Sequence, residues 1–81
     1  MRDPAVAAQG RHQATAHLAR YFAWEHLPKH LQPVSQECAD LALNMIERLP
    51  DGPELTTGLR KLLEAKDCFV RAALDIPAVE G

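Results

Sequence analysis

The chain has 81 residues, of which 47% are hydrophobic and 25% are charged, and its net charge is −2. A chain of this length forms one small domain, which needs disulfides, metal or partner subunits for part of its stability. The charge disfavours a duplex nucleic-acid binder, no apolar run is long enough for a membrane span, and the N-terminus lacks a secretory signal pattern. The two isolated cysteines, Cys38 and Cys68, are expected to be buried, reduced thiols of a cytoplasmic protein.

Residues 1–11 are rich in alanine and read as a flexible N-terminal lead-in, so the folded domain is expected to span 12–74. Apolar residues recur at helical spacing from 12 to 23, which predicts a short first helix, with Tyr21 and Phe22 available to anchor it. Pro28 then breaks the pattern, and residues 24–30 are expected to form a connector.

Two longer helices follow, at about 33–49 and 53–74, and the tail from 75 to 81 is expected to be loose. Between them lies the tip sequence PDGPE at 50–54, in which Asp51 can cap the next helix and Pro53 suits its first turn. So short a tip predicts an antiparallel helical hairpin. The predicted fold class is all-α, a hairpin preceded by a short N-terminal helix.

The two hairpin helices carry more apolar surface than one hairpin interface uses. Ala39, Leu43 and Ile46 lie beside the main apolar stripe of the first helix, and Gly58, Ala65 and Ala72 form a seven-residue repeat of small residues on the second. The first helix is expected to cover only part of this surface, and soluble monomers rarely expose so much. We therefore expect a symmetric homo-oligomer.

Lys66 falls in the middle of the apolar stripe of the second hairpin helix. It either extends to solvent along its own methylene groups or points into a pocket that holds an anion or a buried carboxylate, and spacing alone does not decide between these. Arg60 and Arg71 have acidic neighbours four residues away, at Glu64 and Asp67, so a solvated ladder of ion pairs is favoured over a phosphate site.

No catalytic or metal motif stands out, so neither enzyme activity nor a cofactor is expected. His26 and His30 have helical i,i+4 spacing, but Pro28 separates them and no third ligand is evident, so no metal site is expected. Trp24 with Lys29 offers a different chemistry, an aromatic ring for stacking beside a cation for phosphate, which suits a nucleotide.

Three segments resemble the helical-hairpin family of phage proteins that sequester cyclic-nucleotide signals of the bacterial CBASS and Thoeris defences. They are FAWEHLPK at 22–29, PDGPE at 50–54 and LRKLLEA at 59–65. The resemblance extends over roughly 20–74. It implies a homo-oligomer, typically a hexamer, with ligand sites between protomers.

The resemblance also implies roles for particular residues. Trp24 takes the place of the base-stacking aromatic and Lys29 that of a phosphate-contacting cation, with Phe22 and His26 in the same segment. Thr57, Arg60 and Lys61 lie where some members bind a second, larger cyclic ligand. Lys66 and Arg71 have no firm counterpart but are kept as candidate ligand-binding residues.

Two functions follow as hypotheses. The first is a non-catalytic sponge, working in the cytoplasm of the host cell if phage-encoded, that binds cyclic di- or trinucleotides or a cyclic ADP-ribose-type signal by stacking and by Lys/Arg–phosphate contacts. The second is a protein-interaction or assembly module that uses its surplus apolar faces and takes no small molecule.

Overall fold

The computed structural model describes residues 3–77, and over this range the chain is all-helical, which confirms the predicted fold class at that level. The elements are α1 (Pro4–Ala7), α2 (Gln13–Ala19), the 3-10 helix η1 (Arg20–Phe22), α3 (Gln32–Arg48) and α4 (Pro53–Ala73). The molecule is elongated, with principal extents of 41 × 23 × 17 Å. No helix in this range is long and apolar enough to cross a membrane.

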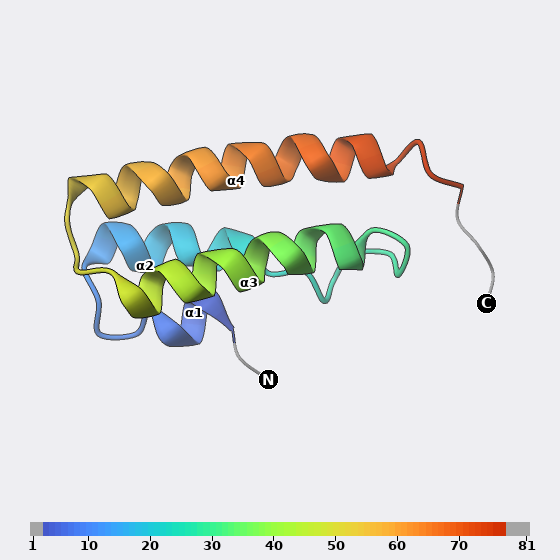
Figure 1. Cartoon of the computed structure of the whole chain (residues 1–81). Coiled ribbons are helices and arrows are strands. Elements are labelled where there is room, and N and C mark those ends of the chain that lie inside the picture. The colour runs from blue at the N-terminus through green and yellow to red at the C-terminus, as the bar shows by residue number, and fades with distance from the viewer. Residues whose placement is uncertain (1–2, 78–81) are drawn as a thin grey trace.

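The helices α3 and α4 lie side by side and run in opposite directions along the length of the molecule (Figure 1). Each of their bounds lies within one residue of the expected position. A proline in the first turn begins each helix, and Leu49 leaves α3 in extended backbone just before Pro50. The prolines at the ends of these two helices are therefore sufficient to set the helix bounds.

The N-terminal segment differs from the expected flexible lead-in over residues 3–11. Asp3 caps α1 by accepting a hydrogen bond from the Ala5 N–H at 2.9 Å, and Pro4 begins the helix. Ala8 is fully buried, because its small side chain lets α1 lie close against the rest of the core. The first two residues of the lead-in, and residues 78–81 of the predicted tail, lie outside the described range.

The N-terminal elements cover the α3 surface that was expected to remain in excess. Ala39, Leu43 and Ile46 are 4% exposed or less, since α1 and η1 pack on α3 while α2 packs on α4. Phe22 is also fully buried, and it anchors η1 in the core. Gly58 and Ala72 on α4 stay exposed, so the N-terminal elements cover only part of the surplus surface, as expected.

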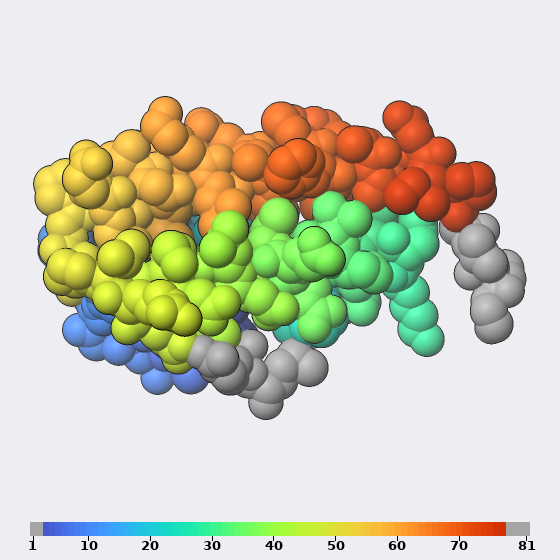
Figure 2. All heavy atoms as spheres, in the orientation of Figure 1, coloured from blue at the N-terminus to red at the C-terminus, as the bar shows by residue number. Residues whose placement is uncertain are grey.

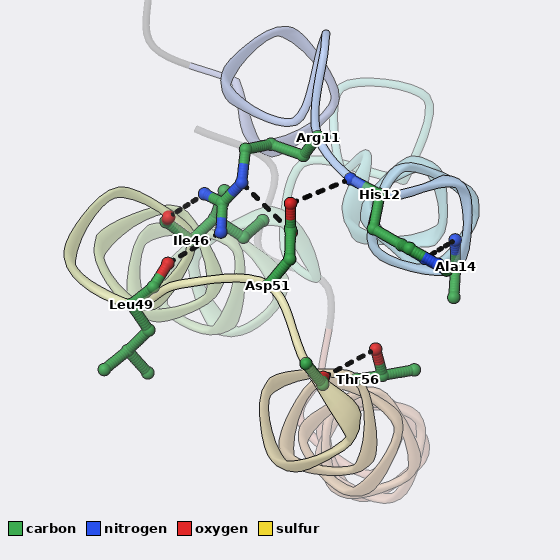
Figure 3. A network of polar contacts seen from close by, with 8 residues as sticks. Arg11, His12, Ala14, Ile46, Leu49, Asp51 and Thr56 are labelled. Atoms are coloured by element: carbon green, nitrogen blue, oxygen red, sulfur yellow. Dashed lines mark hydrogen bonds and ion pairs between the residues drawn. The ribbon is translucent and has the colours of Figure 1, made fainter.

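Asp51 does not cap α4, contrary to the sequence-based expectation. The N-cap position is Gly52, with no side-chain hydrogen bond to the helix. The Asp51 carboxylate instead accepts hydrogen bonds from Arg11 Nε and from the His12 backbone N–H, both at 3.1 Å (Figure 3). The turn between α3 and α4 is thus attached to the start of α2.

Arg11 completes this attachment, which we call the Arg11 clasp. Its guanidinium donates to the Ile46 carbonyl and, at 2.6 Å, to the Leu49 carbonyl, while pairing with Asp51 (Figure 3). These carbonyls lie at the C-terminal end of α3, where backbone acceptors lack helical partners and the helix dipole favours a cation. One side chain therefore joins the N-terminal segment, the end of α3 and the following turn.

Candidate functional site

Lys66 lines a hollow of about 410 Å³ between α4 and the segment that follows α2. Its side chain is only 14% exposed, and its Nζ lies 2.9 Å from Asp67 Oδ1. The Asp67 side chain is 48% exposed, so this ion pair lies at the edge of the hollow, not within the core. The carboxylate beside Lys66 is half-exposed and is not the buried carboxylate of the second alternative, so the structure does not decide between the two.

The hollow gathers residues from two distant parts of the chain. The α4 side chains in this hollow are neighbours on one face of the helix. The other lining residues belong to the η1 region and the connector, about 45 positions earlier in the sequence. We call this the connector hollow; its lining residues are Tyr21, Ala23, His26, Leu27, Lys66, Asp67, Val70 and Arg71. Three of the predicted site residues, His26, Lys66 and Arg71, are therefore brought together here.

Arg71 extends the cationic side of the connector hollow. Its Nη2 donates to the Cys68 Sγ at 3.3 Å, a weak acceptor that leaves most of the guanidinium donors for other partners. Asp67, which the ladder hypothesis pairs with Arg71, contacts Lys66 instead. The charged side chains of Lys66, Asp67 and Arg71 therefore all line the connector hollow.

Tyr21 contributes an aromatic ring to the same hollow and is 51% exposed. The His17 ring meets it edge-on, with centroids 5.4 Å apart, and the Arg20 guanidinium lies 5.8 Å from its centroid. The sequence pattern placed Tyr21 with Phe22 as an anchor, but only Phe22 is buried. Tyr21 and Asp67 are thus site residues that the sequence analysis did not single out for binding.

The predicted stacking pair of Trp24 and Lys29 is not gathered into this hollow. Trp24 is half-buried and packs against the core, Lys29 is exposed in the connector, and neither lines the connector hollow. Gln32 fixes the connector, since its Nε2 donates to the carbonyls of Glu25 at 3.2 Å and Leu27 at 2.9 Å. A glutamine at the start of a helix carries no sequence signal for such a role.

A second hollow, of about 320 Å³, lies at the start of α4 and holds two more predicted residues. Thr57 and Arg60 line it together with His12, Gly52, Pro53 and Thr56. The Thr56 hydroxyl donates to the Gly52 carbonyl at 3.2 Å, as part of the first turn of α4. Lys61 is exposed on α4 and lines neither of these two hollows.

The outer side of α3 and α4 carries an apolar groove in two parts, of about 560 and 250 Å³, that share Leu41 and Leu62. Figure 2 shows the two helices in contact along one face of the molecule. Leu41, Leu49 and Phe69 line this groove while remaining 43–54% exposed. We call this surface the α3–α4 groove.

Over residues 3–77, no three His, Cys, Asp or Glu side chains lie close enough to share a metal ion. Comparison with protein-family models, curated proteins and solved structures gives no match for the chain.

Proposed function

We propose that this protein is a non-catalytic sponge that binds a cyclic di- or trinucleotide, or a cyclic ADP-ribose-type signal, and thereby counters anti-phage defence in the host cytoplasm. The observation that carries the proposal is the placement of α4 cations in separate hollows. Lys66 and Arg71 line the connector hollow with His26, and Arg60 lines the second hollow with His12 and Thr57. Cations and hydroxyl donors in concave sites suit ligands that carry more than one phosphate.

Binding without cleavage is the simplest use of such groups. Cations and hydrogen-bond donors stabilise a phosphate ester in its ground state, whereas cleavage needs groups that act only in the transition state. Sequestration needs high affinity and many sites. Rigid binding pockets supply the affinity, and several identical copies in one particle supply the number of sites. The resemblance to the phage sponge family points to the same activity.

The proposed particle is a symmetric homo-oligomer, a hexamer by the resemblance, built from α3–α4 helical hairpins. Its support is the exposed α3–α4 groove and Gly58, at which an added Cβ meets nothing within 4 Å in the single chain. A glycine inside a helix lowers the stability of the helix by about 1 kcal/mol relative to alanine. Close packing of a second helix against Gly58 would account for a glycine at this position.

The small residues Gly58 and Ala65 of α4 suit one antiparallel register with a second copy of the helix. In that register Phe69 of one copy would lie opposite Gly58 of the other, and Leu62 opposite Ala65. Alternation of large and small residues is what lets two helices interdigitate closely. An isologous contact of this kind generates a two-fold axis.

Calorimetric titration with cyclic di- and trinucleotides and with cyclic ADP-ribose isomers tests the proposal. We expect tight uptake of at least one member, and heat denaturation followed by chromatography should return that ligand intact. Arg71→Gln should weaken binding at least tenfold. Arg48→Gln, which removes a guanidinium from an exposed site on α3 that lines neither hollow, should change it less than threefold.

Three results would count against a sponge. A chemically altered ligand after heating would identify an enzyme, and no uptake of any member would remove the sponge proposal. Equal effects of Arg71→Gln and Arg48→Gln would mean that the connector hollow is not the site.

The α3–α4 groove favours a second candidate function, a protein-interaction module that binds an amphipathic helix of another protein. Its lining residues are mostly apolar, with Glu37 and Glu54 as the charged ones. A groove of this kind suits an apolar helix face with basic flanks. In that case Phe69→Glu abolishes partner binding while the connector-hollow variants leave it unchanged.

A further inference from the structure

The aromatic side chains near the connector differ in how accessible they are to a ligand. Phe22 is fully buried, and Trp24 packs half-buried against the core. Tyr21 is 51% exposed and lines the connector hollow together with Lys66 and Arg71. Of these rings, the one that shares a hollow with cations is therefore that of Tyr21.

The Tyr21 ring is positioned by His17 and by Arg20, whose guanidinium lies over one face of the ring. His17, one helical turn earlier, meets it at an interplanar angle of 73°, and Arg20 approaches it at 5.8 Å. These contacts restrict the ring orientation, yet half of the side chain stays accessible. A positioned and accessible ring loses little conformational freedom when a planar group stacks on it.

The charges beside the ring favour a phosphate. Among the residues that line the hollow, Asp67 offsets part of the Lys66 charge at 2.9 Å, which leaves the charge of Arg71, whose observed partner is a thiol. A guanidinium with free donors binds phosphate in a bidentate manner. The half-exposed Asp67 carboxylate also leaves an acceptor at the rim for an N–H or O–H of the ligand.

We propose that Tyr21, in place of Trp24, is the ring on which a nucleotide base stacks, and that Arg71 and Lys66 contact the phosphate of that same nucleotide. This inference rests on the proposed function and assigns its stacking residue. At about 410 Å³, the connector hollow falls within the size range of small-molecule sites.

The chain has one tryptophan and one tyrosine, which permits a direct spectroscopic test. In the Trp24→Phe variant all tyrosine emission comes from Tyr21, and we expect saturable quenching of that emission on titration with cyclic GMP–AMP. Calorimetry with the same ligand should show a loss of about 5- to 150-fold for Tyr21→Ala, the range for removal of one base–aromatic stack. Tyr21→Phe, which keeps the ring, should stay within threefold of wild type.

Inorganic pyrophosphate separates stacking from charge, because it has phosphates and no base. Its binding should fall with Arg71→Gln and be unchanged by Tyr21→Ala. Circular dichroism melts establish that each variant is folded, and the Trp24→Phe emission experiment reports on the ring even if Tyr21→Ala does not fold.

The results distinguish this inference from the proposed function. Tight binding of cyclic GMP–AMP that is lost in Trp24→Ala and kept in Tyr21→Ala would overturn the Tyr21 assignment and leave the sponge intact. Nucleotide binding with no change in Tyr21 emission would overturn it as well. Failure of the wild-type chain to bind any cyclic nucleotide would remove both proposals.

Discussion

The two cysteines differ in environment although both lie on the long helices. Cys38 is 8% exposed at the floor of the α3–α4 groove, whereas Cys68 is exposed on α4 beside Arg71. Desolvation raises the pKa of the Cys38 thiol; the nearby Lys66 charge opposes this and Glu37 reinforces it. The exposure of Cys68 contradicts the expectation of two buried thiols, and the two thiols should react differently with thiol reagents.

Because the pKa of Cys38 is raised, the free energy of unfolding depends on pH in the alkaline range. Above about 8.5 the unfolded chain releases this proton while the folded chain keeps it, so the free energy of unfolding falls as pH rises towards the folded-state pKa. Urea unfolding between pH 7 and 10 should show this decrease, and Cys38→Ala should reduce it. Cys68→Ala is the control.

Thiol labelling gives an independent check of the same difference. A disulfide reagent at neutral pH should label Cys68 rapidly and Cys38 only after unfolding. Equal labelling rates in the folded protein would contradict the burial of Cys38.

At the scale of elements, the Arg11 clasp holds the N-terminal helices against the end of α3. The Arg11 guanidinium contacts the Ile46 carbonyl, the Leu49 carbonyl and the Asp51 carboxylate, and its side chain is 23% exposed (Figure 3). Because water competes for these groups, their contribution is smaller than that of a fully buried set. The clasp nevertheless connects segments 35 to 40 residues apart.

Arg11→Ala should lower the free energy of unfolding by about 1–2 kcal/mol, since three charge-assisted contacts are lost together. Arg11→Lys should recover only part of this, because a single ammonium cannot donate to all three acceptors in the fork geometry. Lys61→Ala, an exposed site on α4, serves as the control for loss of one positive charge. Equal melting temperatures for Arg11→Ala and wild type would show that the clasp does not stabilise the fold.

At the scale of the whole molecule, the remaining exposed apolar surface lies largely on one side. The N-terminal helices cover the inner surfaces of α3 and α4, while the α3–α4 groove stays open with Leu41, Leu49 and Phe69 at its walls. A chain of 9.0 kDa gains appreciable burial by closing such a groove against another copy. Self-association is therefore expected to involve this face.

Phe69→Glu should convert an oligomer into a 9.0 kDa monomer in sedimentation velocity, because a carboxylate is costly to desolvate in an apolar contact. Leu74→Glu makes the same change at a residue that is 60% exposed and lies outside the groove lining, so this variant should remain oligomeric. Gly58→Gln should also dissociate the oligomer, since its side chain has free space in the single chain and would block close approach of a second helix.

A wild-type chain that sediments as a monomer at tens of micromolar would contradict self-association. Dissociation by Leu74→Glu alone would assign the interface to another face.

The sequence alone determined the features that depend on neighbouring residues. The helical class and the bounds of α3 and α4 follow from apolar spacing and from prolines at the helix ends, which act within one or two turns. The candidates Lys66 and Arg71 could also be named from residue type and spacing, whereas His26 was named only through the family resemblance. No pattern in the neighbouring sequence indicated that these three side chains line the same hollow.

Tertiary structure decided which segment covers which face and which partner each polar group takes. Periodicity shows that Ala39, Leu43 and Ile46 share a side of α3, but only the packing of residues 4–22 shows that they are buried. Likewise Asp51 has the pattern of a helix cap, yet Arg11 and His12, about 40 residues away, hold its carboxylate. Contacts at such separation depend on the whole chain folding, so the roles of Asp51 and Tyr21 could not be read from local sequence.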